Sequence, residues 1–182
     1  MLIVTGLPAT GKSTLASRLA DVLDLPSMAK DIVKEALFEA LGAGDAGWSR
    51  RLSDASFATM FALALRQVRQ GHSLLLEGNF RPGEHEAAIV RIAPDRIAQV
   101  LCSVSDSTRS ARLQRRARSR SRHPGHRDSA AAAAASTSAV TAAPESGFLE
   151  LPGPRLHYDG DAARRGDIAA LVAVLREWLR AQ

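Results

Sequence analysis

The sequence is poor in cysteine and in aromatic residues. Cys102 is the only cysteine among 182 residues, which excludes a disulfide within the chain and favours a reducing, cytoplasmic environment. Aromatic residues make up 4% of the chain, and none lies among the arginines of residues 109–127, so a stacking surface for single-stranded nucleic acid is not favoured. No apolar run approaches the roughly 20 residues of a membrane-spanning helix, and we therefore expect no membrane association.

Residues 6–13, in contrast, read GLPATGKS and match the pattern G-x-x-x-x-G-K-[ST]. An apolar run at residues 2–5 precedes this loop, and we therefore expect no signal peptide. Residues 12–23 have the helical spacing of apolar side chains. A strand, a glycine-rich loop and a helix in this order direct backbone N–H groups and a helix N-terminus at one point. The sequence therefore predicts a site for the phosphates of a nucleoside triphosphate.

The residues of this loop have separate expected roles. Gly6 and Gly11 permit backbone conformations that a Cβ atom would obstruct. Lys12 would reach the β- and γ-phosphates, and the Ser13 hydroxyl would bind Mg²⁺. The expected nucleotide-binding residues are Gly6, Leu7, Pro8, Ala9, Thr10, Gly11, Lys12, Ser13 and Thr14.

Apolar runs and helical patterns alternate along the rest of the chain. We expect strands at residues 2–5, 26–30, 73–77, 96–104 and 155–158. We expect helices at residues 12–23, 32–41, 50–70, 84–93, from about 107, and 168–180. Continuous apolar strands between helices predict an α/β domain over residues 1–182, with a parallel sheet covered on both faces.

Ligands of such sheets bind at the carboxyl ends of the strands, which directs attention to Asp31, to residues 77–79 and to residues 105–106. Asp31 follows the second strand, where its carboxylate would take the proton of an acceptor hydroxyl. Lys34 lies one helical turn further on and would hold an anionic acceptor or the transferred phosphoryl group. Alternatively, Asp31 is the N-cap of the helix that follows.

An arginine-rich tract follows the fourth strand and contributes to the net charge of +5. We interpret residues 107–128 as a lid whose arginines close over the triphosphate, with Arg112 and Arg116 as the contacts. The alternative is a solvated helix face. Residues 129–147 form an alanine-rich, low-complexity segment within the domain.

The phosphate loop, the sequence Lys30-Asp31-x-x-Lys34, the run at residues 76–80 and the arginine-rich segment together resemble the AAA-type ATP-binding kinases. These small P-loop kinases are similar to the kinase domain of polynucleotide kinase, chloramphenicol phosphotransferase, gluconate kinase and zeta toxin. The resemblance implies a three-layer α/β/α sandwich of the nucleoside-monophosphate-kinase type with five parallel strands, and it implies ATP and Mg²⁺ as cofactors.

The resemblance also assigns roles to single residues. It implies that Asp31 is the general base and that Glu77 acts on Mg²⁺ through water. Asn79 and Arg81 would then line the acceptor pocket, although an ordinary turn at these residues is the alternative. The family commonly has arginine at the position of Lys34, and lysine lacks the bidentate fork that suits a phosphate-bearing acceptor.

The leading hypothesis is an ATP-dependent phosphotransferase that acts on a hydroxyl of a small molecule, as a monomer or homodimer. One alternative is a polynucleotide 5′-hydroxyl kinase, favoured by the basic charge, and another is a regulatory nucleotide-binding ATPase without an acceptor. A GTPase is not favoured, because Asn79 is the only asparagine and an N-K-x-D motif is therefore absent.

Overall fold

The computed structural model describes residues 1–93, 96–118, 147–162 and 165–181. Part of the expected lid, residues 119–128, and nearly all of the alanine-rich segment, residues 129–146, lie outside the described residues. Among the described helices, none combines the length and the apolar character needed to cross a membrane.

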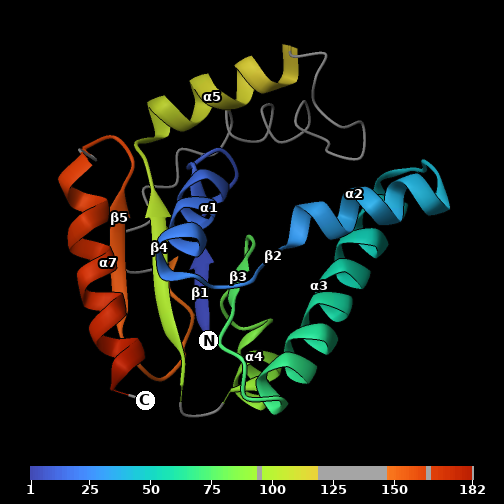
Figure 1. The fold of residues 1–182 in the computed structure, drawn as a ribbon. Helices are drawn as coiled ribbons and strands as arrows, with labels where there is room; N and C mark the ends of the chain where they lie inside the picture. Colours follow the sequence, from blue (N-terminus) through green and yellow to red (C-terminus); the bar gives the residue numbers. More distant parts are fainter. Residues whose placement is uncertain (94–95, 119–146, 163–164, 182) are drawn as a thin grey trace.

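Five parallel strands form one sheet in the order β2-β3-β1-β4-β5, which confirms the predicted parallel α/β fold (Figure 1). The strands are β1 (Leu2–Thr5), β2 (Ser27–Ala29), β3 (Leu75–Glu77), β4 (Ala98–Ser103) and β5 (Arg155–Asp159). The helices are α1 (Lys12–Leu23), α2 (Lys30–Leu41), α3 (Ala46–Arg69), α4 (Glu86–Ile92), α5 (Asp106–Arg118) and α7 (Arg165–Arg180).

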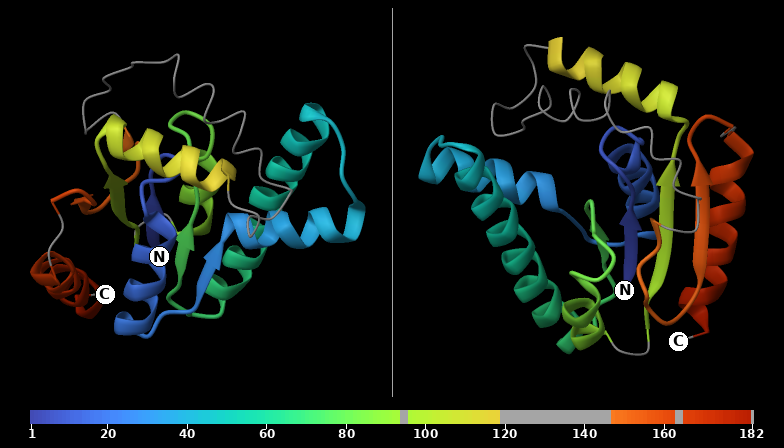
Figure 2. Two further views of the ribbon diagram at one scale, coloured as in Figure 1. Left: turned by 90° about the horizontal axis from the view of Figure 1, so that it is seen from above. Right: turned by 180° about the vertical axis from the view of Figure 1, so that it is seen from behind.

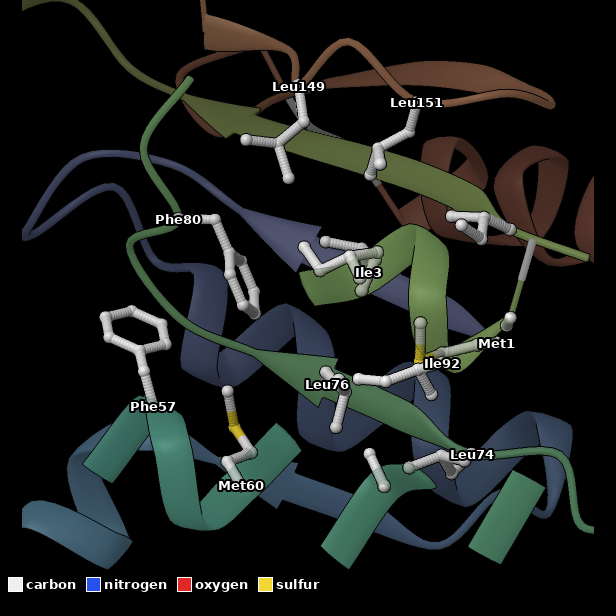
Figure 3. Packing of buried hydrophobic residues seen from close by; sticks show 14 residues of the cluster. Met1, Ile3, Phe57, Met60, Leu74, Leu76, Phe80, Ile92, Leu149 and Leu151 are labelled. Atoms are coloured by element: carbon white, nitrogen blue, oxygen red, sulfur yellow. The ribbon is translucent and has the colours of Figure 1, made fainter. Parts of the chain in front are cut away.

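Alternate residues of the central strands enter two hydrophobic cores, one on each face of the sheet. Ile3 and Leu76 lie in the core beneath α3 and α4, where they pack near Met60 (Figure 3). Leu2 and Leu75 face the opposite core, which α1 and α7 cover. This two-residue alternation gives the three layers of an α/β/α sandwich.

Two groups of helices lie at the carboxyl edge of the sheet. Helix α5 crosses over this edge, and α2 packs against α3 at one side of it (Figures 1 and 2). The ends of β1, β2 and β3 therefore lie between α5 and the α2–α3 pair.

Three helices begin earlier than the sequence predicted, and one of them, α7, begins at Arg165 rather than at residue 168. Helix α2 begins at Lys30, and its N-cap is Ala29, so the alternative in which Asp31 is the N-cap is wrong. Helix α3 begins at Ala46, because the Asp45 side chain caps it by accepting a hydrogen bond from Trp48 N at 2.7 Å. Asp31 consequently lies in the first turn of α2 rather than before it.

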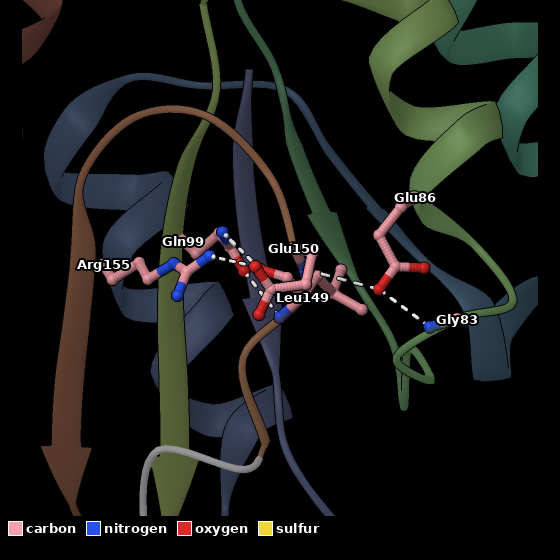
Figure 4. A network of polar contacts seen from close by, with 6 residues as sticks. All are labelled: Gly83, Glu86, Gln99, Leu149, Glu150 and Arg155. Atoms are coloured by element: carbon pink, nitrogen blue, oxygen red, sulfur yellow. Dashed lines mark hydrogen bonds and ion pairs between the residues drawn. The ribbon is translucent and has the colours of Figure 1, made fainter.

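The chain after residue 146 is anchored to the sheet by a buried amide (Figure 4). Gln99 of β4 donates from Nε2 to the carbonyl of Leu149 at 3.2 Å and accepts from Leu149 N at 3.0 Å. Arg155 pairs with Glu150 at 3.2 Å at the surface beside it. Both hydrogen-bonding groups of the buried amide are thus satisfied, as burial requires.

Candidate functional site

The glycine-rich loop between β1 and α1 has three residues with positive φ. These are Gly6 at +148°, Ala9 at +69° and Gly11 at +99°. A Cβ atom at Gly6 would lie 2.2 Å from the carbonyl oxygen of Cys102, so the loop approaches β4 too closely for a side chain. Glycine at this position is therefore a requirement of packing as well as of conformation.

The N-terminus of α1 opens onto this loop. Its N-cap is Gly11, and no side chain among the described residues caps the helix there. The first N–H groups of a helix need partners from outside it, and they carry the positive end of its dipole. The start of α1 is consequently suited to bind an anion, as the sequence predicted.

Lys12 and Glu77 form an ion pair beside the phosphate loop. Lys12 Nζ lies 3.8 Å from Glu77 Oε1, and the two side chains are 10% and 4% exposed. Burial raises the pKa of Glu77, whereas the positive charge of Lys12 and a hydrogen bond with the Ser13 side chain act in the opposite direction. The pairing of β3 with β1 and β2 places Glu77 beside Val4 and Ala29, which brings this carboxylate to the centre of the carboxyl edge.

A cavity of about 330 Å³ contains the two predicted metal ligands and the predicted general base. Ser13, Asp31 and Glu77 all line it, although they come from α1, α2 and β3. The other residues that line it are Ala16, Ser17, Ser27, Met28, Ala29, Ile32 and Glu35. The described part of the chain contains no group of three or more His, Cys, Asp or Glu side chains arranged to hold a metal ion.

The chemistry of these residues nevertheless fits Mg²⁺. This ion usually takes one or two protein ligands together with water and substrate phosphates, rather than a full protein cage. The Ser13 hydroxyl and the Glu77 carboxylate are hard oxygen donors in one cavity, beside the loop that is suited to phosphates.

A second cavity, of about 340 Å³, lies on the other side of the phosphate loop. Arg112 of α5 closes one side of it and donates from Nη1 to the carbonyls of Thr10 at 3.0 Å and Ala9 at 3.3 Å. Arg116, the other predicted contact, lines the same cavity. The other residues that line it are Ala9, Thr10, Gly11, Thr14, Leu15, Arg18, Arg115, Tyr158, Gly160 and Ile168.

Six of these lining residues were not among the predicted nucleotide contacts, namely Leu15, Arg18, Arg115, Tyr158, Gly160 and Ile168. Tyr158 and Gly160 reach the phosphate loop only because β5 pairs with β4, and no local pattern reveals that pairing. Among the predicted loop residues, Gly6, Leu7, Pro8 and Lys12 line neither of the two cavities, and Leu7 is exposed.

The residues predicted to bind the acceptor lie in different environments and do not form one group. Lys34 is buried, and its Nζ donates to the Ser49 hydroxyl of α3 at 3.0 Å. Arg81 is exposed and pairs with Glu84 at 3.0 Å, while Asn79 is half-buried and lines neither cavity. Phe80 points into the core beside Phe57 (Figure 3).

Lys30 lies beside the predicted general base, and the sequence analysis gave it no role of its own. Its Nζ lies 3.3 Å from Asp31 Oδ1 and 5.8 Å from the centroid of the Phe57 ring. A signal was present in the composition, because only three of the 24 basic side chains are lysines. All three, Lys12, Lys30 and Lys34, are buried at the carboxyl edge, where each is at most 8% exposed.

Comparisons with known proteins agree with this architecture. A family model described as AAA domain matches residues 1–139. An uncharacterized protein of Mycobacterium tuberculosis is 30% identical over 173 residues, which are 89% of this chain and 34% of that protein. The chain thus spans about a third of the length of the curated relatives it matches.

Solved structures extend the likeness over the whole chain. A candidate kinase from Chloroflexus aurantiacus is 31% identical, with a TM-score of 0.80 over 97% of this chain and 96% of that one. A gluconokinase from Sinorhizobium meliloti (17% identity, TM-score 0.57, 100% and 95% coverage) shares the fold. So does a shikimate kinase from Bacteroides thetaiotaomicron (19% identity, TM-score 0.54, 98% and 97% coverage).

Proposed function

The chain belongs to the AAA-domain family and has the fold of small P-loop kinases, and from this premise we propose that it is an ATP-dependent phosphotransferase whose acceptor is a hydroxyl of a small molecule. One observation carries the proposal. Ser13, Glu77 and Asp31 line a single cavity beside the phosphate loop, which unites a phosphate site, oxygen ligands for a metal and a carboxylate base.

Separate groups of residues contact the phosphates, the metal ion and the rest of the nucleotide. The uncapped N-terminus of α1 and Lys12 bind the phosphates, while Arg112 and Arg116 approach from α5. Ser13 would bind Mg²⁺ through its hydroxyl and Glu77 would act on the ion through water, and the bound ion would supply positive charge beside the phosphates. The cavity beside Tyr158 and Ile168 lies next to the loop and accommodates the rest of the nucleotide.

Asp31 acts on the acceptor. Its carboxylate orients the hydroxyl and takes the proton as the oxygen forms a bond to the γ-phosphorus. The bond between that phosphorus and the bridging oxygen breaks, and ADP leaves with the bonding electrons. Lys30 Nζ lies 3.3 Å from Asp31 Oδ1, and this ion pair holds the carboxylate at the start of α2, where it would face the acceptor hydroxyl.

The test is the Asp31→Asn variant, assayed with ATP and a panel of sugars, sugar acids, aminoglycosides and nucleosides. We expect acceptor-dependent ADP release to fall by about 10²–10⁴-fold, while the affinity for ATP stays within twofold. Asp21→Asn, at an exposed position on α1, is the matched control and should retain full transfer. Turnover that survives in Asp31→Asn would show that another group takes the proton.

A polynucleotide 5′-hydroxyl kinase is the second candidate, because Arg115 and Arg118 are exposed on α5 next to the phosphate loop. That function predicts transfer to a 5′-hydroxyl oligonucleotide and binding that weakens steeply with salt. Equal ADP release with and without every acceptor would instead favour a regulatory ATPase.

A further inference from the structure

We propose that the chain forms a symmetric homodimer through the outer edge of β5, with the two copies of this strand paired antiparallel about His157. The proposal is independent of the phosphotransfer reaction. It concerns the end of the sheet remote from β2, where β5 and α7 lie side by side (Figure 1). It rests on the direction of the backbone groups in β5, on the order of its charges and on an apolar groove beside it.

The backbone of β5 has hydrogen-bonding groups on its outer edge. This strand is the last of the sheet, and among the described residues it pairs only with β4. Gln99 N donates to the Pro154 carbonyl at 2.8 Å, and Gly160 N donates to a carbonyl of β4 at the same distance. Backbone groups point to alternate sides along a strand, so the even-numbered residues of β5 face β4 and the odd-numbered residues direct their N–H and C=O groups outward. Such an edge is a template for another strand.

The odd-numbered residues of β5 are Arg155, His157 and Asp159, and all three are exposed. When two copies pair antiparallel about His157, each Arg155 lies opposite the Asp159 of the other copy, and opposite charges in that position attract. A shift of the register by two residues loses both of these pairs. Charged side chains often protect an edge strand from pairing, but the order found here favours one symmetric arrangement.

Both charged side chains can take a partner from a second copy in addition to their partners within the chain. Arg155 pairs with Glu150 at 3.2 Å, its side chain is 41% exposed, and a guanidinium group has further N–H donors for a second carboxylate. Asp159 Oδ1 accepts from Asp161 N at 2.9 Å and from Ala162 N at 3.4 Å. These bonds leave Oδ2 of the same carboxylate for the arginine of the other copy.

An apolar groove of about 410 Å³ lies between β5 and α7 at the same edge. The apolar and aromatic residues that line it include Leu156, Tyr158, Ala170, Leu171 and Val174. Val174 is 45% exposed, although its side chain is aliphatic. The proposed pairing brings Leu156 of each copy opposite Tyr158 of the other as non-hydrogen-bonded pairs, in which side chains approach most closely. Burial of this surface would favour association, and Tyr158 also lines the cavity beside the phosphate loop, so the interface adjoins the nucleotide site.

Sedimentation equilibrium of the full chain measures the association. The wild type should have the mass of two chains. Arg155→Glu places like charges at both interchain pairs and should weaken the dimer about tenfold or more. Arg91→Glu makes the same change of charge at an exposed position of α4, and this matched control should leave the dissociation constant unchanged. A monomeric wild type, or equal dissociation constants in the wild type and Arg155→Glu, would overturn the proposal.

A mixture of two variants tests the register. Asp159→Arg alone should dissociate as readily as Arg155→Glu alone, because each variant has like charges at both pairs of its own dimer. In a mixed dimer of these two variants, both interchain pairs again join opposite charges. The equimolar mixture should therefore recover the mass of two chains, and a mixture as monomeric as its components would contradict this register.

A cross-link tests the register without altering Arg155 or Asp159. Only the residue on the two-fold axis lies opposite itself, at a Cα–Cα distance of about 5.5 Å in a hydrogen-bonded antiparallel pair, which a disulfide can span. With oxidised glutathione, His157→Cys should form a covalent dimer, whereas Arg91→Cys on α4 and the wild type with its buried Cys102 should not. Absence of the cross-link in a folded His157→Cys chain would refute the proposed pairing.

Discussion

Lys12 and Glu77 form a nearly buried ion pair, with Nζ 3.8 Å from Oε1, between the phosphate loop and the end of β3. Each group is also a candidate ligand of the nucleotide complex, Lys12 for the phosphates and Glu77 for Mg²⁺. In the absence of a nucleotide, each charge is therefore compensated by the other. Binding of Mg·ATP would replace this pair with stronger partners for both residues.

The first prediction concerns this pair. Lys12→Met should weaken ATP binding by about tenfold to a hundredfold, because an ammonium group that donates to phosphate is lost. It should also lower the free energy of unfolding at neutral pH, since Glu77 then stays buried without its nearby cation. Calorimetry and urea unfolding measure the two effects.

The double variant Lys12→Met/Glu77→Gln is the control for the loss of stability. It should recover most of the stability lost in Lys12→Met, but none of the ATP affinity. If the double variant is as unstable as the single one, the ion pair does not account for the loss.

The second prediction concerns the close approach of the phosphate loop to β4. Gly6→Ala should destabilise the fold by about 1–3 kcal/mol and abolish ATP binding, because its Cβ atom would overlap the Cys102 carbonyl. Gly71→Ala is matched in its positive φ of +82°, but nothing lies within 4 Å of its Cβ position. It should cost only about 1 kcal/mol of conformational strain in urea unfolding.

The third prediction concerns the arginines of α5. Arg116→Ala should lower the turnover number by about 10³-fold or more and change ATP affinity far less, because arginine stabilises charge that develops during phosphoryl transfer. Arg118→Ala, at an exposed position outside the cavity, is the control. Pre-steady-state transfer measurements should show the loss in the chemical step, and an unchanged rate in Arg116→Ala would reject this role.

The fourth prediction concerns the pH dependence of stability. The pKa of Lys34 in the folded chain lies below its ordinary value of 10.5, so between these two values the unfolded chain binds more protons. The contribution of Lys34 to stability therefore rises as the pH increases through the lowered pKa towards 10.5. Urea unfolding at several alkaline pH values should show a weaker rise in Lys34→Met than in the wild type, and identical slopes would contradict the assignment.

The sequence predicted the architecture because its central strands are apolar throughout. In β1 and β3, residues of both faces are buried, and such runs are typical of parallel strands between two helical layers. The phosphate loop was equally clear, since its pattern, its preceding strand and its following helix are contiguous. Asp31 and Glu77 could be found by the same reasoning, as residues that directly follow or end a strand.

The features that the sequence did not predict arise from contacts between segments that are distant in the chain. Lys30 and Lys34 have the composition of a solvent-exposed helix face, and only the packing of α2 against α3 buries them. Tyr158 joins the phosphate loop through the β4–β5 pairing, which spans the residues between 103 and 155. The early start of α3 was missed because Gly44 and Gly47 flank its capping residue, and glycine there is typical of a loop.

All three lysines are buried at the starts of α1 and α2. Proteolysis after lysine therefore reports on the opening of this one region. An endopeptidase that cleaves after lysine has three target bonds, and all of them lie in the first two turns of α1 or α2. A protease needs an extended strand, so cleavage requires one of these helix starts to unwind. Digestion rates with this enzyme would thus report the local opening of these two helix starts.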